Sequence, residues 1–64
     1  SRVAFSNSGD IWIVPLNDSG ATQLTSGPWE DDFPDWASET KIVFQRRTDT
    51  GAPWEIWALQ VPEL

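Results

Sequence analysis

Three short apolar runs place the strongest constraint on the fold of this chain. VAF (3–5), IWIV (11–14) and IVF (42–44) are apolar at consecutive positions rather than at alternate ones. An antiparallel strand with one wet face alternates apolar and polar residues. Strands built from these runs therefore require cover on both faces. A sheet cannot cover its own two faces, so we expect neighbouring sheets on each side.

Turn residues divide the chain into six expected strands. Pro or Gly interrupts every window long enough for a helix, and the apolar runs are rich in β-branched and aromatic residues. NSGD (7–10) and NDSG (17–20) are typical of tight turns. Residues 26–32 are expected to form a loop, with Pro34 at the start of the strand that follows. The expected strands, in one antiparallel meander, are 2–6, 11–16, 21–25, 33–37, 41–47 and 54–61.

The chain contains an internal repeat. RVAF (2–5) aligns with KIVF (41–44) at an offset of 39 residues, and DIWIV (10–14) aligns with EIWAL (55–59) at an offset of 45. A repeat of about 40 residues with several short strands is typical of a β-propeller blade. Each blade of a propeller is a sheet covered on both faces by its neighbours, as the apolar runs require.

Composition excludes several function classes. Ten acidic residues against four basic ones give a net charge of −6, which repels phosphate backbones, so nucleic acid is not an expected partner. Without Cys or His, neither a structural zinc site nor a Ser-His-Asp triad can form. No apolar run is long enough to span a bilayer, so we expect no membrane insertion. Five Trp and three Phe indicate a chain that folds.

The densest acidic segment is PWEDDFPDWASETK (28–41). Glu30, Asp31, Asp32 and Asp35 lack the spacing of a calcium loop, and adjacent residues of an extended segment point to opposite sides. A loop flanked by Pro, without His, Cys or Lys, does not suggest an acid/base pair. We expect no catalytic residue, no metal and no cofactor, and the acids other than Asp32 to be mostly solvated.

Both units resemble the TolB-type β-propeller repeat, a relative of the WD40-like propellers. The match begins with an Asp-x-Pro-x-Trp opening, continues in a Lys-Ile-x-Phe strand and ends in an Ile-Trp strand and a Gln-Leu-Thr segment. It covers nearly all of the chain and indicates fold more specifically than function. The expected structural signature of the repeat comprises Asp32, Pro34, Trp36, Lys41, Phe44, Ile56, Trp57, Phe5, Ile11 and Trp12.

The resemblance implies how the chain is divided. Residues 1–27 would form the outer three strands of one four-stranded blade, and residues 28–64 the inter-blade crossing and inner three strands of the next. The chain would thus be a fragment of about one and a half blades. Asp32 is expected to accept turn or backbone hydrogen bonds. One departure concerns ASETK (37–41), which lacks the family's Pro and Gly, so we expect a different turn there because Thr40 tolerates positive φ poorly.

Aromatic and basic side chains supply the candidate binding residues. Trp36, Phe44, Trp57, Phe5 and Trp12 recur at repeat positions and are expected in the inter-blade core. Trp29 and Trp54 follow Pro in loops and have no repeat counterpart, which makes them candidates for a binding surface. Arg46 and Arg47 are candidates for surface ion pairs or for contact with an acidic partner.

The resemblance implies a non-catalytic role in a protein–protein interaction scaffold of the periplasm or cell envelope. The expected partners are another protein or neighbouring blades, and self-association of the chain is a further option. Two alternatives remain at this point. One is a piece of the gating propeller of a prolyl-oligopeptidase-type serine peptidase, and the other is a self-assembling blade whose identical copies close a ring.

Overall fold

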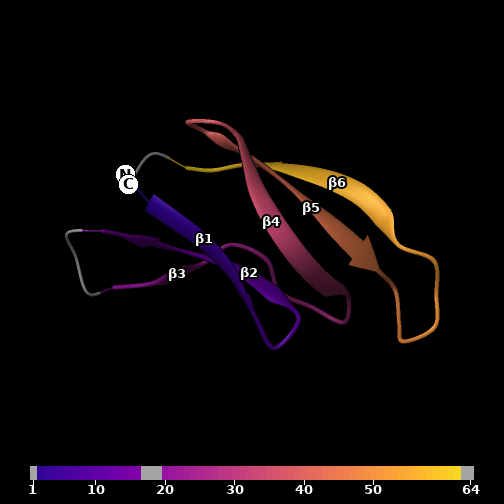
Figure 1. The fold of residues 1–64 in the computed structure, drawn as a ribbon. Coiled ribbons are helices and arrows are strands. Elements are labelled where there is room, and N and C mark those ends of the chain that lie inside the picture. Colours follow the sequence, from indigo (N-terminus) through magenta and orange to yellow (C-terminus); the bar gives the residue numbers. More distant parts are fainter. Residues whose placement is uncertain (1, 17–19, 63–64) are drawn as a thin grey trace.

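The computed structural model describes residues 2–16 and 20–62 as two three-stranded antiparallel sheets (Figure 1). The first sheet has the order β1-β2-β3, from Arg2–Asn7, Asp10–Pro15 and Thr22–Gln23. The second has the order β4-β5-β6, from Glu30–Ser38, Lys41–Arg47 and Glu55–Gln60. The described residues contain no helix, which confirms the expected all-β antiparallel class. Accordingly, no helix that could cross a membrane is found among them. The six strands follow one another as an antiparallel meander that is divided between two sheets, because β3 and β4 are not paired.

The first sheet is built around a tight β1–β2 hairpin. Asn7 pairs with Asp10, and the two residues between them have positive φ, 54° at Ser8 and 82° at Gly9. Positive φ at both central positions suits the right-handed twist of a two-residue hairpin. The NSGD segment therefore forms the expected turn.

Replacing Gly9 with alanine should destabilise the chain by about 1–2 kcal/mol, because an L-residue resists the left-handed conformation. Steric crowding does not add to this loss of stability, since the nearest atom to a new Cβ would be the Trp29 carbonyl oxygen at 3.7 Å. Urea denaturation followed by tryptophan fluorescence measures the loss. Gly20→Ala is the matched control, because Gly20 has no positive φ and a Cβ added there would meet no atom within 4 Å. Equal stabilities of the two variants would contradict the prediction.

The third strand is shorter than the expected 21–25, because only Thr22 and Gln23 pair as a strand. Beyond them the backbone amides of Leu24 and Thr25 both donate to the Ile11 carbonyl oxygen, at 2.8 and 3.3 Å. The Thr25 hydroxyl in turn accepts a hydrogen bond from the Ile11 amide at 2.9 Å. Because both amides donate to the same carbonyl oxygen, the regular pattern of hydrogen bonds between β2 and β3 ends here. Residues 17–19 of the predicted NDSG turn lie outside the described residues.

Strand β4 begins three residues earlier than expected, so the predicted loop 26–32 is wrong for its last three residues. Pro34 is also not at the start of its strand but inside it, at a register shift between Asp32 and Asp35. Phe33, beside it, has a φ of 53°. A bulge leaves residues without a ladder partner, so a proline without an N–H is tolerated there.

The turn in ASETK (37–41) closes with two residues, Glu39 and Thr40, between the paired Ser38 and Lys41. Neither turn residue has a positive φ. The Ser38 hydroxyl accepts a hydrogen bond from the Thr40 amide at 3.3 Å. The backbone thus avoids the conformation that a β-branched residue resists.

The two hairpins β1–β2 and β5–β6 have the same pairing register. With the offsets of 39 and 45 residues, all six pairs of one hairpin coincide with the six pairs of the other. The pairs Val3↔Val14, Ala4↔Ile13 and Phe5↔Trp12 thus correspond to Ile42↔Leu59, Val43↔Ala58 and Phe44↔Trp57. The sequence repeat is therefore also a structural repeat.

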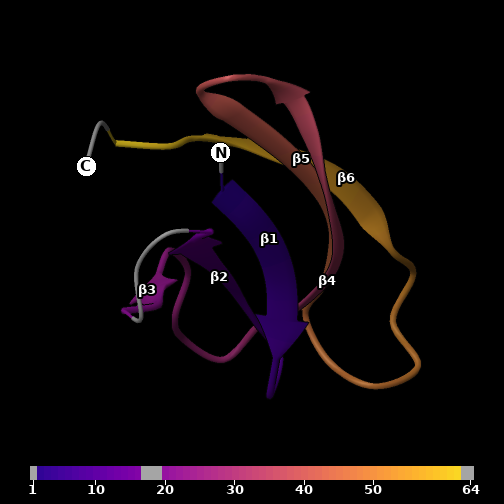
Figure 2. The same cartoon turned by 60° about the vertical axis from the view of Figure 1, so that its left-hand side comes forward.

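The two sheets pack against each other through one face each, with β1 beside β4 (Figures 1 and 2). Ile11 and Ile13 of β2 and Ile42 of β5 have no exposed surface, and Phe44 and Val61 complete the buried cluster. Burying such side chains stabilises the fold by about 1.5–3 kcal/mol each. The core thus lies between the sheets.

The expected aromatic core is only partly correct. Phe44 is buried and Trp36 packs against the core, but Phe5 and Trp12 stack on each other, with ring centroids 6.4 Å apart, on the opposite face of the first sheet. Trp57 is 44% exposed. It lies on β6, which contacts only β5 among the described strands, so the first sheet does not cover it.

Candidate protein-interaction surface

Two acid–arginine pairs connect the beginning of β4 to the end of β5, where the register places Glu30 opposite Arg47 and Asp31 opposite Arg46. Arg46 donates through Nε to Asp31 Oδ1 at 2.7 Å and through Nη2 to Oδ2 at 3.0 Å. Arg47 donates to the two Glu30 carboxylate oxygens at 2.9 and 3.1 Å. Both pairs have the two-pronged geometry in which guanidinium and carboxylate match best.

In the Asp31–Arg46 pair the acid is buried and the arginine is partly buried. The Asp31 side chain is 1% exposed and that of Arg46 16%. The prediction of a mostly solvated acid is therefore wrong for Asp31, whereas the ion pair expected for Arg46 is present, with the arginine partly buried. The reason is that β4 crosses the first hairpin here, where the Asp31 amide donates to the Gly9 carbonyl oxygen at 2.8 Å.

This environment also fixes the charge of Arg46. The hydrogen bonds to Asp31 raise the pKa of Arg46, burial acts in the opposite direction, and the negative charge of Asp31 adds to the increase. A raised pKa of a base means that its stabilising contribution is complete below the unfolded pKa and is lost only as the pH rises through the folded pKa. Arg46 therefore remains a cation throughout the neutral range.

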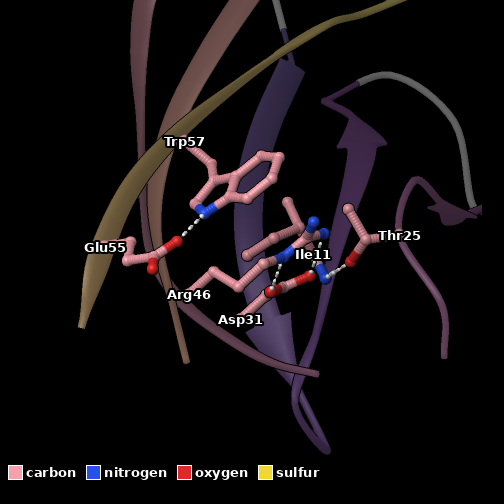
Figure 3. Close-up of polar contacts among 6 residues, drawn as sticks. All are labelled: Ile11, Thr25, Asp31, Arg46, Glu55 and Trp57. Carbon is pink, nitrogen blue, oxygen red and sulfur yellow. Dashed lines mark hydrogen bonds and ion pairs between the residues drawn. The ribbon is translucent and has the colours of Figure 1, made fainter. Parts of the chain in front are cut away.

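Three aromatic rings lie near the Arg46 guanidinium, whose N–H groups donate to Asp31; Figure 3 shows Asp31 and one of the rings, Trp57, beside Arg46. Its central carbon lies 4.8 Å from the ring centroid of Trp57, 5.3 Å from that of Phe44 and 5.4 Å from that of Trp29. Trp57 is held in addition by its indole N–H, which donates to Glu55 Oε1 at 3.0 Å. Each cation–π contact contributes about 0.5–2 kcal/mol, depending on its desolvation.

A similar stack lies in the β5–β6 hairpin, where the Arg47 guanidinium is 4.3 Å from the ring centroid of Trp54. Trp54 is 37% exposed and Trp29 41%. Together with Arg46 and Trp57, these residues form what we call the Trp–Arg surface, defined as Trp29, Arg46, Arg47, Trp54 and Trp57. Its side chains are held by ion pairs and stacking although much of their area faces solvent.

A small hollow opens in the Trp–Arg surface. Its volume is about 140 Å³, and its lining consists of Trp29, Arg46, Arg47, Thr48, Ala52, Pro53, Glu55 and Trp57. Pockets for small-molecule ligands usually measure about 300–1,000 Å³. This hollow is therefore suited to one inserted side chain of a partner rather than to a complete small-molecule substrate.

Two larger depressions border side chains that already make hydrogen bonds within the chain, Arg2 in one case and Asp32 in the other. One, of about 520 Å³, lies beside Arg2, which donates to the Glu39 carbonyl oxygen at 2.9 Å and stacks on Trp36. The other, of about 530 Å³, borders the acidic segment. There Asp32 Oδ1 accepts hydrogen bonds from the Phe33 amide at 2.9 Å and the Ser6 hydroxyl at 2.8 Å. Among the described residues, no three acidic side chains are grouped for a metal ion.

The structure brings together the four candidate binding residues Trp29, Trp54, Arg46 and Arg47, although they come from two segments. Sequence reasoning missed Trp57 as part of this surface, and it missed Asp31 and Glu55 as the acids that hold Arg46 and Trp57. A usable signal was present, because Glu30-Asp31 and Arg46-Arg47 are complementary in charge when paired antiparallel. Lys41, which was expected as a structural residue of the repeat, has an exposed side chain beside the β4–β5 turn.

Comparisons with protein-family models, with curated proteins and with solved structures return no match.

Proposed function

We propose that this chain is a non-catalytic repeat fragment of a TolB-type β-propeller and contributes to a protein–protein interaction scaffold of the cell envelope. In this proposal the Trp–Arg surface contacts the partner protein. The observation that carries it is the gathering of three tryptophans, each 37–44% exposed, around two arginines that acidic residues hold in place. Trp and Arg are enriched among the residues that dominate binding energy at protein interfaces.

Rigid presentation strengthens this interpretation. Ordering a flexible side chain on binding costs about 0.5–1.5 kcal/mol. Arg46 and Arg47 are already fixed by two hydrogen bonds each, and Trp54 and Trp57 stack on them. A partner that covers these residues therefore loses little additional conformational entropy.

The hollow and the charge indicate what kind of partner segment fits. A volume of about 140 Å³, bordered by Trp29 and Trp57, accepts one apolar side chain. The net charge of −6 attracts basic groups during encounter. We therefore expect a polypeptide segment with one apolar side chain flanked by Lys or Arg.

Peptides selected from a random library against the immobilised chain test this proposal. They should be apolar at one position and basic around it, and Trp54→Ala should weaken their binding about tenfold or more, because truncating a central aromatic typically costs over 1 kcal/mol. Isothermal titration calorimetry measures the affinities. Thr50→Ala, in the same loop, should leave them unchanged. Failure to enrich any sequence, or equal binding to both variants, would contradict the proposal.

A further inference from the structure

The two sheets pack through faces that are not equivalent in the repeat. The first sheet buries the face that carries Ala4, Ile11 and Ile13. Their repeat counterparts, at the offsets of 39 and 45 residues, are Val43, Ile56 and Ala58 of the second sheet. These counterparts share the opposite face, pointing away from the core, and Ile56 is 79% exposed.

The same relation holds in the other direction. The second sheet buries the face that carries Ile42, Phe44 and Leu59. Their counterparts in the first sheet are Val3, Phe5 and Val14, on the face that carries the Phe5–Trp12 stack and a 43% exposed Val3. Each exposed outer face is therefore the repeat equivalent of a face that the chain buries.

We propose that a second copy of this chain covers these outer faces, with the outer face of β1–β3 of one copy packed on the outer face of β4–β6 of the next. The interface within the chain indicates why the covering partner is a second copy. That interface already packs one of the two repeat-equivalent kinds of face against the other kind. There the pairing leaves Ile11, Ile13 and Ile42 with no exposed surface. The contact between copies repeats this interface with Val3, Phe5 and Val14 facing Val43, Ile56 and Ala58.

Such an association is heterologous, because unlike faces meet. A heterologous contact leaves one free face of each kind after every addition, so copies continue to add until they form a ring or a filament. Contact between like faces would instead stop at a dimer. This distinction makes the proposal testable without knowledge of the final number of copies.

Electrostatics gives the expected dependence on salt. Two copies with a net charge of −6 each repel one another. Screening shortens the range of this repulsion, to about 10 Å at 0.1 M salt and about 3 Å at 1 M. The association should therefore become stronger as salt is added, whereas an interface held by ion pairs would weaken.

Sedimentation velocity on single and mixed variants tests the proposal. Val3→Lys blocks one outer face and Ile56→Lys the other, and each alone should weaken self-association about tenfold or more because a lysine replaces an apolar interface residue. An equimolar mixture should form a one-to-one heterodimer of twice the 7.2 kDa chain mass, because each variant retains the face that the other lacks. Both substitutions change the net charge from −6 to −5, which by itself favours association.

Thr50→Lys is the matched control for charge and should associate as the unchanged chain does. Circular dichroism verifies that both face variants fold, and Val14→Lys replaces Val3→Lys if the latter does not. A monomeric unchanged chain at millimolar concentration would overturn the proposal. So would undiminished association of Ile56→Lys, or a mixture that remains monomeric. Peptide binding measured on the folded Ile56→Lys variant separates failure of this proposal from failure of the function proposed for the Trp–Arg surface.

Discussion

Replacing Arg46 with alanine is expected to unfold the isolated chain. The substitution leaves the carboxylate of Asp31, which is 1% exposed, without the two hydrogen bonds at 2.7 and 3.0 Å that compensate its charge. Removing one partner of a buried ion pair costs about 3–5 kcal/mol. A folded chain of 64 residues has about 3–10 kcal/mol of stability in total. The loss is therefore comparable to the complete stability of the fold.

The effect is measured by urea denaturation of the purified variant, followed by tryptophan fluorescence and far-UV circular dichroism. Arg47→Ala is the matched control, because it removes a neighbouring arginine with the same two-pronged geometry. The Glu30–Arg47 pair has exposed fractions of 37% and 21%, and such a pair contributes only about 0.2–1 kcal/mol. Equal or greater stability of the Arg46 variant would contradict the prediction that the buried carboxylate of Asp31 requires its arginine partner.

Ile11→Ala should destabilise the chain by about 2–5 kcal/mol, whereas Ile56→Ala should change its stability by less than about 0.5 kcal/mol. The two isoleucines occupy equivalent positions of the repeat, but their exposed fractions are 0% and 79%. In the first case a cavity opens between the sheets. In the second, the lost side chain faces solvent.

The comparison is made by urea denaturation at low protein concentration, where copies do not associate. The same atoms are removed in the two variants, at equivalent positions of the two hairpins. At high concentration, Ile56→Ala should in addition weaken self-association. Similar losses of stability for both variants at low concentration would contradict the assignment of the buried face.

Local sequence patterns predicted most strands well. β1, β2, β5 and β6 lie within about two residues of their expected bounds, because β-branched and aromatic runs between turn residues act on the nearest neighbours along the chain. The beginning of β4 was missed. Glu30 and Asp31 carry no apolar signal, and they become strand residues only through pairing with Arg47 and Arg46.

The binding role of the candidate residues stays a prediction, but local sequence features did single out residues that the structure brings together. Trp29 and Trp54 stood out because they lack repeat counterparts, and Arg46 and Arg47 because they are the only basic pair in the sequence. The structure places the four residues in one surface. The inclusion of Trp57 did not follow from its sequence position, since its repeat counterpart Trp12 stacks on Phe5 instead. A repeat position fixes which face a side chain belongs to, but not whether that face is covered.

The sequence by itself determined the all-β class, the two hairpins with one register, and the need of their strands for cover on both faces. These properties depend on turn residues and on side-chain alternation, which operate over a few residues. Only the tertiary structure decided which of two equivalent faces is buried, that Ile11 is enclosed while Ile56 is exposed, and that Asp31 is a buried ion-pair partner. The physical reason is that burial is a property of the covering surface, and here that surface comes from a sheet distant in the chain.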